Sequence, residues 1–134
     1  MIKKTVTYTD YNGTERTETF YFHFTHAEIL DMEMSVEGGF AERVQRIIDA
    51  KDQTSLLKLI KTFVLDAYGV KSDDGRRFIK SNEVKEAFVE CPAYSEIYME
   101  LLTDDAVAAE FVNKVIPDDM KDRLAKLVAK GSTT

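Results

Sequence analysis

The hydrophobic pattern of this chain changes its period near residue 25, and this change constrains the fold more than any other feature. Up to residue 24, apolar and polar residues alternate, which is typical of β-strands with one buried face. After residue 25, apolar residues recur three and four positions apart, as they do along one face of an α-helix. A chain with this order is expected to begin as a β-hairpin and to continue as packed helices.

The first 24 residues predict the hairpin. Two runs rich in β-branched and aromatic residues flank Asn12-Gly13. Asn-Gly favours a type I′ turn, because both central positions of that turn need a positive φ. Alternation places Phe20, Phe22 and Phe24 on one face of the second strand. Since an isolated hairpin is only marginally stable, this phenylalanine face is expected to pack on the helices that follow.

Helical periodicity runs from residue 25 to about residue 128 and is interrupted by a polar segment at residues 70–78, where Asp74-Gly75 predicts a tight turn. The first helix begins with a capping box, in which Thr25 and Glu28 each satisfy a backbone N–H of the other. Gly69 stands where a left-handed residue is expected just after a helix. Further helices are expected near residues 40–48, 54–68, 81–91, 93–102, 106–115 and 118–128. The predicted fold class is α+β, mainly α, with an N-terminal β-hairpin followed by a bundle of about six or seven short helices.

Length and composition predict a single domain. The 134 residues fit one domain of ordinary size, with residues 1–24 as the hairpin, 25–130 as the helical part and 131–134 as a disordered tail. The net charge of −6 argues against a nucleic-acid partner, because phosphate contacts need clustered Lys and Arg. No apolar run is long enough for a signal peptide or a membrane span. The single cysteine, Cys91, excludes an internal disulfide and suits a reducing cytoplasm.

No residue pattern predicts catalysis or a bound metal. His23 and His26 straddle the junction of strand and helix and complete no ligand set. Cys91 is distant in sequence from both histidines, whereas a catalytic thiol needs a base beside it. The loop around Gly75 departs from the calcium-binding pattern, since Ser81 stands where the bidentate Glu belongs. We therefore expect no enzymatic activity, no cofactor and no metal.

Charge is distributed unevenly along the chain. The net charge is −4 over residues 26–50, +3 over 51–81, −7 over 82–110 and +2 over 111–134. Alternating charge of this kind permits binding to a complementary partner or association between copies of the chain. It equally permits internal salt bridges or a solvated surface, so self-association stays open.

Two apolar groups are candidate partner-binding surfaces. The methionine group comprises Ile29, Leu30, Met32 and Met34, and the tyrosine group comprises Tyr94, Tyr98 and Met99. Methionine side chains repack readily around different partners, and tyrosine is favoured at interfaces. Core packing is the alternative for both groups, because a small domain must bury its helical stripes.

Three segments of the chain resemble the tail-assembly chaperones of long-tailed (siphovirus-type) bacteriophages. They are AEILDMEMS at residues 27–35 before Gly38-Gly39, YGVKSDDGRRFIKS at 68–81 and AYSEIYMEL at 93–101, with the last match extending through Thr103-Asp104 and Phe111 to Pro117. The resemblance covers most of residues 5–117 and fades in the final helix. It rests on overall pattern, since none of the segments is a catalytic signature.

The resemblance implies an assembly protein of the host bacterial cytoplasm that is absent from, or minor in, the mature virion. Proteins of this family coat the long helical tape-measure protein until tail-tube subunits polymerise around it. The implied partners are therefore the tape-measure protein and possibly the tail-tube protein, with no nucleic acid and no membrane. The alternatives are another phage morphogenesis or adaptor protein, or a small acidic regulatory protein that binds one partner.

Overall fold

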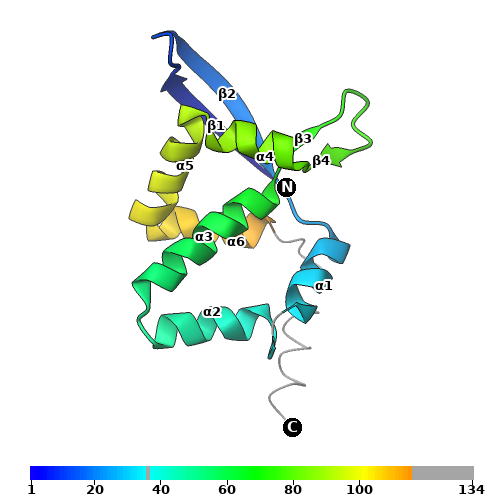
Figure 1. Cartoon of the computed structure of the whole chain (residues 1–134), viewed down its shortest axis with the longest axis vertical. Helices are drawn as coiled ribbons and strands as arrows, with labels where there is room; N and C mark the ends of the chain where they lie inside the picture. Colours follow the sequence, from blue (N-terminus) through cyan, green and yellow to red (C-terminus); the bar gives the residue numbers. More distant parts are fainter. Residues whose placement is uncertain (36, 116–134) are drawn as a thin grey trace.

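The computed structural model describes residues 1–35 and 37–115 (Figure 1). The strands are β1 (Ile2–Thr9), β2 (Glu15–Phe22), β3 (Tyr68–Lys71) and β4 (Phe78–Ile79). The helices are α1 (His26–Met34), α2 (Phe40–Asp49), α3 (Gln53–Ala67), α4 (Asn82–Val89), α5 (Pro92–Thr103) and α6 (Asp105–Val115). The predicted helix near residues 118–128 and the predicted tail at 131–134 lie outside the described residues, so the single domain over 1–130 stays a prediction.

Strands β1 and β2 form the predicted hairpin and pair along all eight residues of each strand. The predicted type I′ turn is wrong, because Gly13 has a positive φ but Asn12 does not. The side chain of Asp10 shapes the connection instead. Its carboxylate accepts hydrogen bonds from the backbone N–H groups of Asn12 and Thr14, both at 2.9 Å. An aspartate that binds the backbone two residues further on is a common way to build a turn.

The phenylalanine face of β2 packs on helices, as the alternation predicts. Phe22 is fully buried, and its ring centroid lies 5.9 Å from that of Phe88 on α4 and 5.2 Å from that of Phe111 on α6. Phe24, just after β2, lies 5.1 Å from Phe63 on α3. These side chains belong to one hydrophobic core. The hairpin and the helices therefore bury each other's apolar surface.

The predicted fold class is wrong, because the described chain after the hairpin contains two further strands among its helices. Two segments that the sequence predicts as a helix end and a polar loop form β3 and β4. They extend the hairpin into one antiparallel sheet of order β1-β2-β3-β4, which makes the fold mixed α/β. β3 pairs with β2 through Tyr21↔Gly69 and with β4 through Val70↔Ile79.

Gly69 explains part of this error. It is not a left-handed residue that ends a helix: it lies within β3 and is not among the glycines with positive φ. A Cβ atom at this position would lie 2.6 Å from Cε2 of Phe78. Glycine is needed here because the aromatic ring from β4 lies directly against the strand, which is one of the uses of glycine in sheets.

The polar segment between β3 and β4 contains the tight turn predicted at Asp74-Gly75. Gly75 has a φ of 72°, and its N–H donates to the carbonyl of Ser72 at 2.9 Å. The carboxylate of Asp74 accepts hydrogen bonds from the Ser72 hydroxyl at 2.7 Å and from the Arg76 N–H at 3.0 Å. This carboxylate is therefore used to hold the loop in shape.

Candidate partner-binding site

Helix α1 presents the methionine group on two sides and not as one stripe. Ile29 is buried in the core, and Met32, almost one turn further on, is half-buried against it. Leu30 and Met34 are exposed, Met34 to 71%. Residues three or four apart share a helix face, so the group divides into an inward pair and an outward pair. The inward pair holds α1 on the domain, and the outward pair is accessible.

The N-terminus of α1 is fixed to the sheet. The predicted capping box is confirmed: the Glu28 N–H donates to the Thr25 hydroxyl at 3.2 Å, and the Thr25 N–H donates to the Glu28 carboxylate at 2.9 Å. Lys80, which follows β4, adds a longer-range link. Its ammonium donates to the Glu28 carboxylate and to the carbonyl of His23, both at 2.7 Å. These contacts set the direction in which α1 leaves the sheet.

The environment shifts the pKa values of this ion pair. Burial lowers the pKa of Lys80 below its usual value, although the hydrogen bond to Glu28 opposes the shift. Burial by itself raises the pKa of Glu28, but the hydrogen bonds from Lys80 and from the Thr25 N–H reverse this effect, so the pKa lies below its usual value. The half-buried Lys80 ammonium and the Glu28 carboxylate, 2.7 Å apart, form an anchor for α1.

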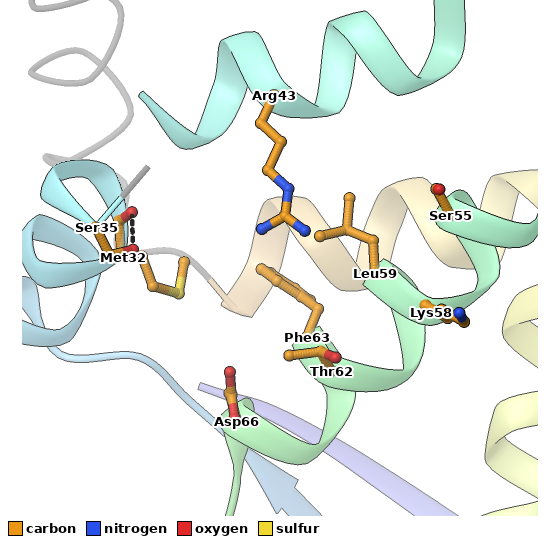
Figure 2. Close-up of a pocket in the computed structure, with 9 residues that line it drawn as sticks. All are labelled: Met32, Ser35, Arg43, Ser55, Lys58, Leu59, Thr62, Phe63 and Asp66. Atoms are coloured by element: carbon orange, nitrogen blue, oxygen red, sulfur yellow. Dashed lines mark hydrogen bonds between the residues drawn. The ribbon is translucent and has the colours of Figure 1, made fainter. Parts of the chain in front are cut away.

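An open pocket of about 300 Å³ lies between α1, α2 and α3 (Figure 2). Its apolar part is made by Met32 from α1 and by Leu59 and Phe63 from α3. The complete lining comprises Met32, Ser35, Arg43, Ser55, Lys58, Leu59, Thr62, Phe63 and Asp66. This volume is at the lower end of the roughly 300–1,000 Å³ of small-molecule pockets, and it suits a few side chains of a partner protein.

The charged residues of the pocket lining are two cations and one acid. Arg43 reaches from α2 across the pocket, and its guanidinium lies beside Leu59 and near Phe63 (Figure 2). Lys58 on α3 supplies a second cation. The one acidic residue of the lining, Asp66, forms an ion pair at 3.5 Å with Lys85 of α4. The pocket therefore joins apolar surface to positive charge.

The tyrosine group on α5 is also divided. Tyr94 and Tyr98 are half-buried and stack on each other with ring centroids 5.8 Å apart. Tyr94 also contacts the Phe88 ring edge-on at 5.3 Å, and burial raises the pKa of its hydroxyl. Met99 lies on another side of the helix and is 52% exposed. Tyr94 thus packs on the core and Tyr98 packs on Tyr94, while Met99 is accessible.

The two predicted groups do not form one surface. In Figure 1, α1 and α5 lie on opposite sides of α3. The pocket is lined by residues of α1, α2 and α3 and by none from the tyrosine group. A partner bound in the pocket would therefore contact Met32 of the methionine group and no residue of the tyrosine group.

Sequence reasoning missed most of the pocket lining. Leu59 and Phe63 fit the apolar pattern of a helix, and that pattern does not separate residues that face the core from residues that face a pocket. Arg43 and Thr62 carry no motif at all. One signal in the sequence pointed to the pocket: residues 51–81 carry a net positive charge, to which Lys58 contributes, beside apolar positions of the same helix.

Other candidate sites remain without a chemical role. Within residues 1–35 and 37–115, no three residues of the types His, Cys, Asp and Glu are arranged to hold a metal ion. His23 contacts the Phe78 ring at 6.4 Å, and burial lowers its pKa. Cys91 occupies the N-cap position of α5 without a side-chain capping bond. None of the helices in the described part of the chain is long and apolar enough to cross a membrane.

Comparison with known proteins identifies the family. A sequence model of a family described as phage tail assembly chaperone matches residues 1–132. The chain therefore belongs to the phage tail assembly chaperone family, as the resemblance predicts. Its role is in tail assembly, and the family description names no enzymatic activity. Neither a curated protein nor a solved structure matched the chain.

Proposed function

We propose that this chaperone holds apolar helical segments of the tape-measure protein and keeps them soluble while the tail tube assembles. Two observations support the proposal: the family, and the open pocket with an apolar floor between α1, α2 and α3. The pocket is the observation that carries it. Helical segments are commonly bound by inserting apolar side chains from one helix face into a groove between other helices.

The arrangement of α1 suits repeated binding of different segments. Met32 lines the pocket, and Met34, two residues further along the chain, is exposed on another side of α1. Methionine is unbranched and polarisable, so it fits side chains of different shapes. A tape-measure protein offers many non-identical helical turns, and an adaptable surface binds them better than a rigid one.

The remaining features of the proposal follow from the same role. We propose that the protein acts in the host bacterial cytoplasm and is absent from, or minor in, the mature virion. The tail-tube protein is a possible further partner, and copies of the chain can associate through their segments of opposite charge. These proposals are supported by the family and by the charge pattern along the sequence.

Co-expression with tape-measure fragments tests the central proposal. Thr62 and Thr54 are both exposed residues of α3, but only Thr62 lines the pocket. Thr62→Trp is expected to fill the pocket and to leave the fragment insoluble, whereas Thr54→Trp is expected to behave like the unmodified protein. Equal solubility of the fragment with both variants would contradict binding in the pocket.

A second candidate is a structural adaptor that stays in the particle and binds through its acidic surface. The observation that favours it is the exposed acidic surface of α4 and α5, formed by Glu83, Glu86, Glu90, Glu96 and Glu100. Within the described part of the chain, Glu100 alone of these forms an ion pair, with Lys4 at 3.0 Å. Mass spectrometry of purified virions separates the candidates, because an adaptor is present in stoichiometric amounts.

A further inference from the structure

The pocket between α1, α2 and α3 is positively charged in a protein that is acidic overall. Arg43 and Lys58 line it, against the single acid Asp66. Asp66 is already paired with Lys85. Among residues 1–35 and 37–115, no carboxylate forms an ion pair with Arg43 or with Lys58. Two cations therefore remain available beside the apolar floor.

Resting on the proposed function, we propose that the pocket selects helical segments that carry a carboxylate one turn away from their apolar anchor residue. The apolar anchor contacts Met32, Leu59 and Phe63, and the carboxylate binds Arg43. The partner is thus an amphipathic helix with acidic residues three or four positions from its anchors, and not any apolar helix.

The orientation of Arg43 supports this assignment. Arg43 is an exposed residue whose guanidinium points into the pocket, toward Leu59 and Phe63 (Figure 2). A guanidinium presents parallel N–H donors that match the two oxygens of a carboxylate. On a helix, residues three or four apart have Cβ atoms roughly 5–6 Å apart, so one segment can fill the floor and reach the cation together.

The charge of the rest of the chain makes the selection specific. Residues 82–110 carry a net charge of −7, so the surface of α4 and α5 repels an acidic segment. The pocket between α1, α2 and α3 combines the apolar side chains of Met32, Leu59 and Phe63 with the cations of Arg43 and Lys58. Complementary charge therefore directs an acidic helix to this pocket, and the apolar floor retains it.

Three synthetic peptides test the proposal against the intact protein. Each is an amphipathic helix of roughly 20 residues, long enough to be partly helical alone, with leucine anchors followed four residues later by Glu, Gln or Lys. Binding is measured by calorimetry for the unmodified protein, for Arg43→Glu and for Lys61→Glu. Lys61 is the matched control, because it is an exposed cation of α3 outside the pocket lining.

We expect the Glu peptide to bind about tenfold more tightly than the Gln peptide, which corresponds to about 1.4 kcal/mol, and the Lys peptide to bind most weakly. Arg43→Glu is expected to reverse the order of the Glu and Lys peptides, and Lys61→Glu to preserve it. Circular dichroism of each variant confirms that it folds.

Three results would overturn the proposal. Equal binding of the Glu and Gln peptides by the unmodified protein would remove the charge selection but leave the proposed chaperone function intact. Failure to bind any of the peptides, and also any tape-measure fragment, would remove both. If inorganic phosphate displaces the Glu peptide at micromolar concentration, Arg43 and Lys58 form a site for a free anion and not for a helix carboxylate.

Discussion

Replacing Phe22 with alanine is expected to destabilise the whole domain, hairpin and helices together. Its side chain is completely buried and contacts the rings of Tyr68, Phe88 and Phe111 at 5.7, 5.9 and 5.2 Å. Removing a buried phenylalanine side chain costs about 3–5 kcal/mol. The three lost aromatic pairs are part of this cost and place it in the upper half of the range, so we expect a loss of about 4–5 kcal/mol. This is a large part of the roughly 5–15 kcal/mol by which domains are stable.

Urea unfolding provides the assay. The chain contains no tryptophan and six tyrosines, so tyrosine fluorescence reports on tertiary packing and far-ultraviolet circular dichroism on the helices. The two signals are expected to change together, as in a two-state transition. Tyr11→Ala is the control, because this side chain is 86% exposed and its loss should cost no more than about 0.5 kcal/mol.

Two outcomes would refute the shared core. One is a loss below about 2 kcal/mol for Phe22→Ala, since full burial predicts more. The other is separate transitions for the two signals, which would mean that the helices fold without the hairpin. If Phe22→Ala does not fold, Phe22→Leu keeps most of the volume and is expected to cost about 1–1.5 kcal/mol.

Three further predictions concern the anchor of α1 and the β3–β4 hairpin. Lys80→Met is expected to lower the free energy of unfolding in urea by about 1–2 kcal/mol. This is less than the loss of a fully buried charged hydrogen bond, because Glu28 is partly exposed. The control Lys85→Met should cost about 0.5 kcal/mol or less. The folded state holds the pKa of Glu28 below its unfolded value of 4.5. The stability that Glu28 contributes is therefore complete above pH 4.5 and is lost as the pH falls through the folded pKa. Lys80→Met should weaken this pH dependence in acid titrations followed by circular dichroism. Gly69→Ala is expected to cost about 1–3 kcal/mol, because its Cβ would meet the Phe78 ring at 2.6 Å, and a change within 0.5 kcal/mol in thermal unfolding would contradict the close approach.

The sequence predicted those elements whose signals are local. Alternating Phe20 and Phe22 located β2 and its buried face, and Thr25 with Glu28 marked the start of α1. Strands β3 and β4 were not predicted, because they are four and two residues long and are too short to show a hydrophobic period. Their pairing depends on contacts far apart in the sequence, such as Tyr21 with Gly69. Tertiary pairing of this kind overrides local pattern.

Of the residues that the sequence singled out for partner binding, only Met32 lines the pocket. The sequence singled out methionines and tyrosines of α1 and α5 as candidate binding surface, and the structure shows that Met34 and Met99 are exposed while Tyr94 packs on the core. The pocket needed the packing of three helices, and Arg43 belongs to it only through that packing. Helical periodicity defines a face of one helix, and a pocket is a property of several.

Photo-crosslinking tests the central claim, that the α1–α3 region binds the tape-measure protein, most directly. A photo-reactive amino acid replaces Met34 or, separately, Met99, because both side chains are exposed but lie on α1 and α5 respectively. Each variant is co-expressed with the tape-measure protein and irradiated. We expect a crosslinked product from position 34 and little from position 99. Crosslinking from position 99 alone, or from neither position while the complex still forms, would contradict binding at α1–α3.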